Sequence, residues 1–404
     1  MDKILRDFSS FYSEEEIVGL TRDLVRIPSH VDTENREVEI GNYIYDWAVK
    51  NGFKAEKVPV DGPRSNVYIH LKGEGNGPTL LLNGHMDTVP PYDMTIDPYE
   101  GFVKEGYIWG RGTNDMKGAV ACMMLSLLVI KRAGLKLKGD VIITAVIDEE
   151  EASIGTEDFI LKGGKADGAV VGEPSGYEYS AGCRGLEWIQ VRFIGKTVHG
   201  GQAHLGINAI SMASRFIEKV NKELEPKINA RTNEYMGPAI HNWGKIYGGD
   251  QVSTVAGECV LQFDRRYVPG ETIESVLAEY QEIIDELHDE DPKFNAEMTL
   301  MPNGQMRQLY HAPLIPEMDS KINIIIEKLL CEYLGVDKAP LNRCRGWTDA
   351  GALSTYAHIP SVIFGPGEIE RSHTKDERTP VKMLYDFVGF YASIISAFCG
   401  VIEE

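Results

Sequence analysis

Short apolar segments alternate with segments of helical periodicity, and this alternation constrains the fold more than any other feature of the chain. Apolar runs cover residues 66–71, 79–82, 141–147, 169–171 and 361–364, and a helical pattern covers residues 116–133. Strands that alternate with helices are typical of an α/β domain built on a central sheet. The sequence therefore predicts the α/β class with a central mixed sheet. It also predicts a first helix that Ser13 caps and a second helix over residues 34–50.

A different order occupies residues 183–301. The pattern there predicts strands at 187–194, 240–247, 260–267 and 294–300 and helices at 208–224 and 273–287. In chain order this is βαββαβ, which predicts a compact α+β insert. Helical and strand signals of the first kind resume at 319–334, 349–356 and 381–398. Because 404 residues exceed what one core supports, we expect a first domain of residues 1–182 and 302–404, interrupted by an inserted domain of residues 183–301.

Charge and cysteine content exclude several classes of function. The 61 acidic residues exceed the 41 basic ones, which gives a net charge of −20 that repels nucleic acid and anionic membrane surfaces. Residues 1–10 lack the apolar core of a signal peptide, and the apolar runs above are shorter than the roughly 20 residues that cross a bilayer. The six cysteines lie far apart and contain no C-x-x-C pair, which fits buried or free thiols of a reducing compartment better than a disulfide frame or a thiolate zinc site. We therefore expect neither a nucleic-acid nor a membrane partner, and a cytoplasmic location.

Potential metal ligands follow four of the predicted strands. His85 follows the run at 79–82, Glu149 and Glu150 follow 141–147, Glu173 follows 169–171, and His373 lies beyond 361–364. In open α/β sheets, ligands bind beyond the carboxyl ends of the strands. Asp115, at the start of the helix over 116–133, adds a further carboxylate near the same crevice.

Two imidazoles and three carboxylates without a thiolate suit zinc, cobalt or manganese. Two divalent ions would carry +4 against the −3 of the carboxylates, so one hydroxide balances the charge. Such an ion pair polarises a carbonyl and activates water near neutral pH. The residues therefore predict two divalent ions per chain, with zinc preferred, and hydrolysis of an acyl bond.

Five motifs occur in the order found in one enzyme family, and together they cover essentially the whole chain. They lie at 84–90, 110–118, 148–150, 172–174, and at 365–367 followed by His373. In these motifs the chain resembles the dinuclear zinc deacylases and exopeptidases, which include acetylornithine deacetylase, succinyl-diaminopimelate desuccinylase and glutamate-type carboxypeptidases. The resemblance implies that one metal is held by His85, Asp115 and Glu173. It implies that the other is held by His373, Asp115 and Glu150, with Asp115 as the bridge and a cis peptide after it.

Other roles near the metals also come from this resemblance. Glu149 is the implied general base, which takes a proton from water and hands it to the leaving amine. Adjacent side chains of an extended segment point in opposite directions, so Glu149 and Glu150 reach one site only if the chain bends after the strand. Asp87 is expected to orient the His85 ring, although a simple turn aspartate is the alternative. Asp148 is expected to be a surface or capping group.

The insert resembles the lid and dimerisation domain of the same family. His199 matches the transition-state histidine that dimeric members take from the partner subunit, which implies a homodimer through the insert. Asn208 matches a substrate-side asparagine, with a helix N-cap as the alternative. Arg266 matches the arginine that grips a substrate carboxylate, with a strand-end salt bridge as the alternative. Arg343 and Arg345 offer charge for an additional anionic group.

These features predict a metal-dependent hydrolase that cleaves the amide bond of an N-acyl amino acid or a small peptide with a free carboxylate. A dipeptidase or aminopeptidase with the same kind of site is the first alternative. A catalytically silent protein that binds a metal or ligand is the second.

Overall fold

The chain forms two compact units. The computed structural model describes residues 3–301, 304–344 and 346–403. Unit 1 comprises residues 3–182, 314–344 and 348–403, and unit 2 comprises the described residues of 183–313 together with 346–347. The predicted return to the first domain at residue 302 falls outside the described residues, and the structure places the return at Leu314.

The segment just before Leu314 belongs to unit 2 because it is hydrogen-bonded there. The backbone N–H of His311 donates to the Glu187 carboxylate at 2.9 Å, and the Tyr267 hydroxyl donates to the carbonyl oxygen of His311 at 2.9 Å. The Trp347 indole donates to the carbonyl oxygen of Ala312 at 2.8 Å. These bonds join distant parts of the chain, so no local pattern in the sequence marks the boundary.

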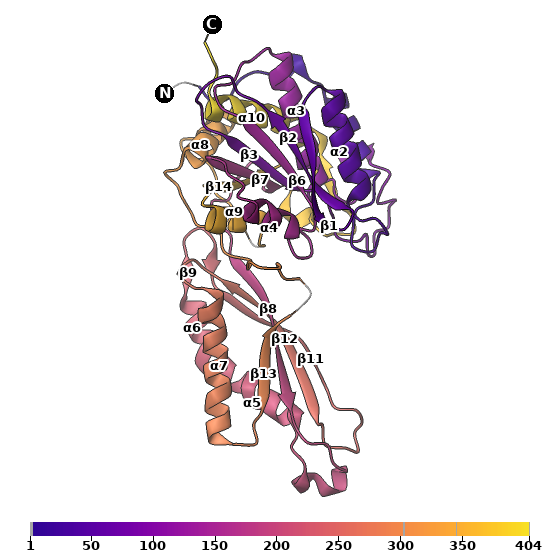
Figure 1. Ribbon diagram of the computed structural model, residues 1–404, viewed down its shortest axis with the longest axis vertical. Coiled ribbons are helices and arrows are strands. Elements are labelled where there is room, and N and C mark those ends of the chain that lie inside the picture. Colours follow the sequence, from indigo (N-terminus) through magenta and orange to yellow (C-terminus); the bar gives the residue numbers. More distant parts are fainter. Residues whose placement is uncertain (1–2, 302–303, 345, 404) are drawn as a thin grey trace. The chain divides into compact units, whose positions relative to one another are not determined.

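A six-stranded mixed sheet forms the centre of unit 1 (Figure 1). Its strands, in spatial order, are β1 (Lys54–Asp61), β2 (Arg64–Leu71), β6 (Val141–Val146), β3 (Leu80–His85), β7 (Gly168–Pro174) and β14 (Ser361–Gly365). The last four run parallel, whereas β1 and β2 are antiparallel to their neighbours. The predicted mixed α/β class is confirmed. A small antiparallel sheet lies outside it and consists of β4 (Phe102–Lys104), β5 (Tyr107–Trp109) and β15 (Arg378–Pro380).

The helices of unit 1 pack against this sheet or against one another. They are α1 (Glu14–Val25), α2 (Val38–Lys50), α3 (Lys117–Arg132), α4 (Ile154–Leu161), α8 (Lys321–Leu334), α9 (Asp349–Ala357) and α10 (Val381–Cys399). Ser13 caps α1 as predicted, since its side chain accepts the Glu16 N–H at 3.2 Å. The second helix begins at Val38 rather than at residue 34, because turns occupy the residues before it.

Helix α3 approaches β3 and β7 closely where both strands carry glycine. A Cβ on Gly84 would lie 2.7 Å from the Met116 side chain, and one on Gly172 would lie 2.5 Å from the Met123 side chain. Glycine therefore lets the start of α3, and with it Asp115, sit against the ends of the two central strands.

The longest helix of unit 1, α10, is an exception to the expectation that every apolar run is too short to cross a bilayer. Val381–Cys399 is long and apolar enough to do so by length and composition. However, 72% of its most apolar window is buried within the protein. Its apolar side chains therefore serve the core of unit 1.

Unit 2 contains a four-stranded antiparallel sheet in the predicted βαββαβ chain order. The sheet order is β11 (Ile240–Gly248), β12 (Glu258–Tyr267), β8 (Gly185–Ile194) and β13 (Ala296–Leu300), and a small hairpin pairs β9 (Thr232–Asn233) with β10 (Gly237–Pro238). The helices are α5 (Ala209–Lys219), α6 (Glu225–Ala230) and α7 (Ile273–Glu290). The predicted helix over 208–224 leaves α geometry after Lys219 and continues as a π turn over Val220–Leu224.

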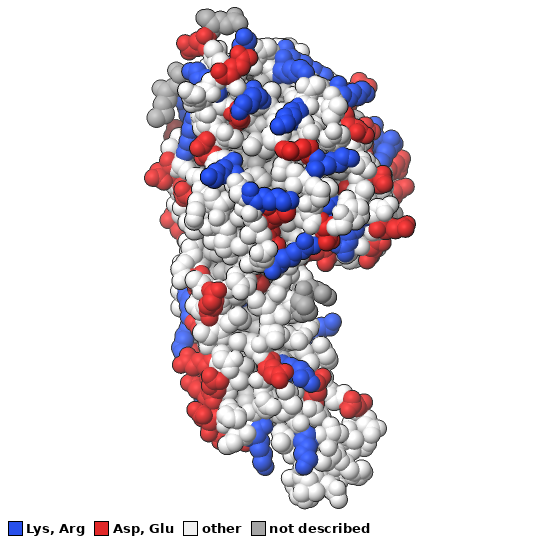
Figure 2. Space-filling model, in the orientation of Figure 1, with Lys and Arg blue, Asp and Glu red and all other residues white. Residues whose placement is uncertain are grey.

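Charged side chains differ between the two units. On the face shown in Figure 2, acidic and basic side chains are interspersed over unit 1, whereas acidic ones gather along the side of unit 2 where α7 lies. Helix α7 carries seven acidic residues and no lysine or arginine. Such a face repels polyanions, which agrees in sign with the net charge of the chain.

Candidate metal centre

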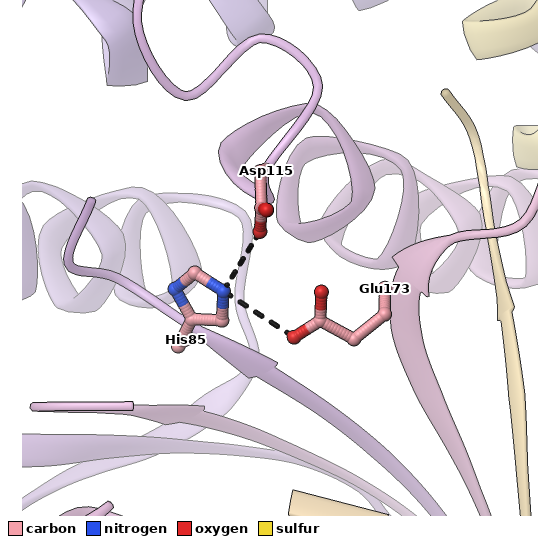
Figure 3. A group of neighbouring side chains, drawn as sticks. All are labelled: His85, Asp115 and Glu173. Carbon is pink, nitrogen blue, oxygen red and sulfur yellow. Dashed lines mark hydrogen bonds and ion pairs between the residues drawn. The ribbon is translucent and has the colours of Figure 1, made fainter. Parts of the chain in front are cut away.

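The carboxyl ends of the parallel strands bring the predicted ligands together. His85 is the last residue of β3, and Glu173 lies near the end of β7. Figure 3 shows Asp115, from the segment that leads into α3, and Glu173 both facing the His85 ring. The His85 Nε2 atom lies 3.2 Å from Asp115 Oδ1 and 3.4 Å from Glu173 Oε1. These three residues form the first ligand group.

The second ligand group shares Asp115. His373 Nε2 lies 3.4 Å from Asp115 Oδ2 and 3.0 Å from Glu150 Oε2. The two groups therefore use different oxygens of one carboxylate, which is the arrangement of a bridging ligand. The Asp115–Met116 peptide bond is cis, as the resemblance implied.

The donor set fits a pair of divalent cations. Within each group, one ligand atom of every residue lies within 4.8 Å of the others. The site also concentrates buried acid. Burial, followed by the charge of Asp115, raises the pKa of Glu173 to about 7, and the same two causes raise the pKa of Glu150. Carboxylates crowded in this way bind divalent cations, and imidazole with carboxylate oxygen suits zinc, manganese or cobalt.

Both histidines are held near carboxylates. Hydrogen bonds to Asp115 and Glu150 raise the pKa of His373 to about 11. Burial acts to lower the pKa of His85, but its bonds to Asp115 and other carboxylates outweigh burial and hold that pKa well above its usual value. Metal ligands must be deprotonated, so metal binding here would release protons.

Asp87 has a different main contact from the one expected. The nearer acceptor for His85 Nδ1 is the backbone oxygen of Asp87 at 3.0 Å, while the carboxylate oxygen Oδ1 is 3.5 Å away. The carboxylate accepts the backbone N–H groups of Glu149 at 3.2 Å and Glu150 at 3.0 Å. Asp87 therefore holds the turn that carries the proposed base and one ligand.

The chain bends after β6, as the placement of both glutamates requires. Asp148 has a φ of +69°, and its carbonyl oxygen accepts the N–H groups of Ala152 at 3.0 Å and Ser153 at 2.6 Å. Glu149 Oε2 lies 4.0 Å from His85 Nε2. Burial, followed by the charge of Glu173, raises the pKa of Glu149 well above its usual value, as suits a proton carrier.

Asp148 is a buried group rather than the predicted surface or capping residue. Its carboxylate pairs with Arg64, and its backbone N–H donates to Glu37 at 3.2 Å. Arg64 in turn makes two hydrogen bonds of 2.7 Å to the Glu37 carboxylate. The sequence analysis missed Arg64 and Glu37, because their partner lies 84 and 111 residues away along the chain.

A second supporting pair was also missed. Glu377 is fully buried, accepts the backbone N–H of Asp115 at 3.1 Å and pairs with Arg111. Its closeness in sequence to His373 was the only available signal, and that signal does not indicate which residues Glu377 contacts.

Three predicted residues lie in unit 2, where each makes a local contact. His199 is exposed, and its Nδ1 accepts the Gly201 N–H at 3.1 Å. Asn208 caps α5, since its Oδ1 accepts the Ser211 N–H at 3.1 Å. Arg266 pairs with both oxygens of Asp264 at 2.8 and 2.9 Å. The structural alternatives for Asn208 and Arg266 are therefore both formed.

Of the two arginines that offer charge for an additional anionic group, the structure describes one. Arg343 is exposed, and Arg345 lies outside the described residues. The neighbouring Trp347 packs edge-on against His311 with ring centroids 4.5 Å apart.

A mixed α/β unit whose strand ends hold two metal-ligand groups that share a carboxylate defines a metal-dependent hydrolase. The chain belongs to peptidase family M20/M25/M40, which it matches over residues 81–397. It is 29% identical to an acetylornithine deacetylase of Pasteurella multocida, over 92% of this chain and 94% of that protein. It is 26% identical to an N-formyl-4-amino-5-aminomethyl-2-methylpyrimidine deformylase of Bacillus subtilis, over 97% and 96% of the two chains. A tripeptidase structure from Staphylococcus aureus has the same fold, with a TM-score of 0.75 and 23% identity over 96% of this chain and 99% of the other.

Proposed function

We propose that this hydrolase cleaves the amide bond of an N-acyl amino acid or a small peptide that carries a free carboxylate. The observation that carries the proposal is the shared Asp115, whose two oxygens face His85 and His373 separately. The deacylases among the relatives, at 26–29% identity, support an N-acyl substrate without specifying the acyl group.

The metal pair is proposed to be zinc, with cobalt or manganese as alternatives. His85 and Glu173 would hold one ion, His373 and Glu150 the other, and Asp115 both. When bound, such ions polarise the scissile carbonyl and lower the pKa of water. Because the site is built largely from buried carboxylates, the ions would also offset negative charge there.

Glu149 is proposed to move the proton. Its carboxylate is next to the first ligand group, and burial raises its pKa, which makes the deprotonated form a stronger base. That form can take a proton from the attacking water and then pass it to the leaving amine. Asp87 would keep Glu149 in place by holding its backbone N–H.

Arg266 and Asn208 are proposed to bind the substrate carboxylate. Arg266 is always a cation, and Asp264 holds its guanidinium in place; a substrate carboxylate can supplement or replace that partner. Asn208 uses its side-chain oxygen for the helix cap, which leaves its amide group for the substrate.

A homodimer through unit 2 is proposed, with His199 of each subunit completing the site of the other. Strand β11 lies at the edge of its sheet, and Ile246 and Tyr247 on it are 52% and 50% exposed. An exposed edge of this kind favours pairing with a second copy. Inactive His199→Ala mixed with inactive Glu149→Gln should regain activity once subunits exchange. Verified exchange without activity would refute the proposal.

A cytoplasmic location is proposed because the six cysteines lie far apart in the sequence and contain no C-x-x-C pair, which fits thiols better than a disulfide frame. Free thiols persist in reducing compartments. Cell fractionation would test this, and recovery of the protein in an oxidising compartment would contradict it.

The deciding experiment is a substrate panel. Acetyl, succinyl and formyl amino acids should be hydrolysed after the protein is supplied with zinc or cobalt, and chelator should abolish turnover. Faster hydrolysis of dipeptides with a free amine would favour the dipeptidase or aminopeptidase alternative. Metal binding with no turnover of either class would favour a silent binding protein.

A further inference from the structure

The ligand His373 lies on a loop, unlike His85, which ends a buried strand. The loop joins β14 to β15, and its only regular element is a short 3-10 turn over Ile369–Arg371. The His373 side chain is 51% exposed, against 1% for His85. A ligand on such a loop depends on contacts that fix the loop relative to the rest of the site.

Asn114, the residue before the shared ligand Asp115, supplies contacts of this kind. Its side-chain oxygen accepts the Glu368 N–H at 2.9 Å, and its side-chain nitrogen donates to the Glu368 carbonyl at 3.1 Å and to Ser372 Oγ at 3.1 Å. Asn114 is fully buried. One side chain therefore reaches both ends of the segment that leads to His373.

Gly367 shows that this approach is close. A Cβ at that position would lie 2.4 Å from the Asn114 side-chain oxygen, and the residue has a φ of +120°. A side chain at position 367 would therefore displace Asn114 from the loop.

Glu377 makes the reverse connection from the far end of the loop. One of its carboxylate oxygens accepts the backbone N–H groups of Gly112 at 2.9 Å, Asn114 at 2.9 Å and Asp115 at 3.1 Å. The loop with His373 thus holds the segment with Asp115 through Glu377, while that segment holds the loop through Asn114.

We propose that Asn114 is a positioning residue that sets the place of His373 relative to Asp115 and thereby the affinity for the ion of the second ligand group. The inference rests on the two-ion site proposed above. The first group takes His85 from β3 and Glu173 from β7, and the shared Asp115 is held through its backbone N–H by Glu377 rather than by the Asn114 side chain. No ligand of the first group lies on the loop, so the affinity of that group should not depend on the Asn114 side chain. Asn114→Ala should therefore act on one ion only.

Metal titration followed by calorimetry, with zinc alone and then with cobalt alone, tests this without any substrate. We expect the wild type to bind two ions and His373→Ala to lose the second. Asn114→Ala should bind the second ion about 10- to 100-fold more weakly, the usual effect of removing a residue that orients a ligand. Its cobalt spectrum at two equivalents should resemble that of His373→Ala.

Two further variants separate positioning from general destabilisation. Asn323→Ala removes another buried asparagine, which donates to the Glu317 carbonyl at 2.9 Å in the capping region of α8, and should keep both wild-type affinities even if its melting temperature falls. Ser372→Ala removes one acceptor only and should weaken the second ion about 2- to 10-fold, so it provides a test if Asn114→Ala does not fold.

Three other results of the metal titrations would contradict the inference. Wild-type affinity for both ions in folded Asn114→Ala, or in Ser372→Ala if that is the testable variant, overturns the role of Asn114. Equal weakening of both ions in these variants also overturns it. A wild type that binds a single ion overturns both this inference and the two-ion site on which it rests.

Discussion

Replacing Asp87 tests what its carboxylate does. Asp87→Ala removes the acceptor of two backbone N–H groups, those of Glu149 and Glu150, but it keeps the backbone oxygen that lies 3.0 Å from His85 Nδ1. An unpaired buried N–H costs about 1–3 kcal/mol. Glu149 and Glu150 are partly exposed, so water can reach the turn. We therefore expect Asp87→Ala to lower the free energy of unfolding by about 2–3 kcal/mol, near the lower limit for two unpaired N–H groups. Asp87→Asn keeps one acceptor oxygen and should lose roughly half as much.

The loss of the Asp87 carboxylate should affect Glu149 and Glu150, which lie on the turn, more than it affects His85 as a metal ligand. We expect Asp87→Ala to weaken the ion held through Glu150 and to lower turnover, because Glu149 loses its position. In a His373→Ala background, where only the first ligand group remains complete, adding Asp87→Ala should change metal affinity little.

Urea unfolding of metal-free protein measures the loss of stability, and calorimetric metal titration measures the change in metal affinity. If Asp87→Ala is as stable as the wild type, the Asp87 carboxylate does not stabilise the fold through the two N–H groups that it accepts. A large loss of affinity in the His373→Ala background would show instead that the carboxylate acts mainly through His85.

Three other predictions follow from the same structure. Glu149→Gln should keep both ions and lose about 10²–10⁴-fold in turnover, and a near-normal rate would remove Glu149 from the mechanism. Arg266→Ala should raise KM for substrates with a free carboxylate and little for amidated analogues, whereas Asp264→Asn should not raise it; equal effects of Arg266→Ala on both substrates would make Arg266 structural. His241 is half-buried beside Tyr280, and desolvation, then the charge of Arg265, lowers its pKa to about 4. Unit 2 should therefore be fully stable above about pH 6.5 and lose up to about 3 kcal/mol as the pH falls from there to 4. Hydrogen exchange in β11 should reveal this loss, and His241→Phe should abolish its pH dependence if the assignment is right.

The sequence predicted the mixed α/β class and the grouping of the metal ligands because both follow from local patterns. A strand that ends in a polar turn is visible within about ten residues, and parallel strands place their carboxyl ends at one edge. His85 and Glu173 follow directly from that rule. The bend at Asp148 was also foreseen, because two adjacent glutamates cannot otherwise reach one site.

The supporting groups could not be predicted in the same way. Arg64 and Asp148 are 84 residues apart, and Glu377 and Asp115 are 262 apart, so only the folded chain shows that they meet. A charged residue at the start of a strand is usually a surface group, and nothing in its neighbourhood distinguishes Arg64 from that class. The segment that leads out of unit 2 depends on distant contacts in the same way, since His311 is hydrogen-bonded to Glu187, 124 residues earlier in the chain.

The ligands of the two groups are therefore held in place by different kinds of contact. His85 and Glu173 are placed by the sheet itself, which fixes them through the backbone pairing of β3 with β7. His373 and Glu150 lie on a loop and a turn, and side chains from elsewhere hold these segments: Asn114 holds the loop and Asp87 holds the turn. Each such contact can be removed without breaking a strand, so occupancy of the second group can be altered while the fold and the first group remain. Substitutions at Asn114 and Asp87 should consequently separate the two ions, which substitutions in the strands cannot do.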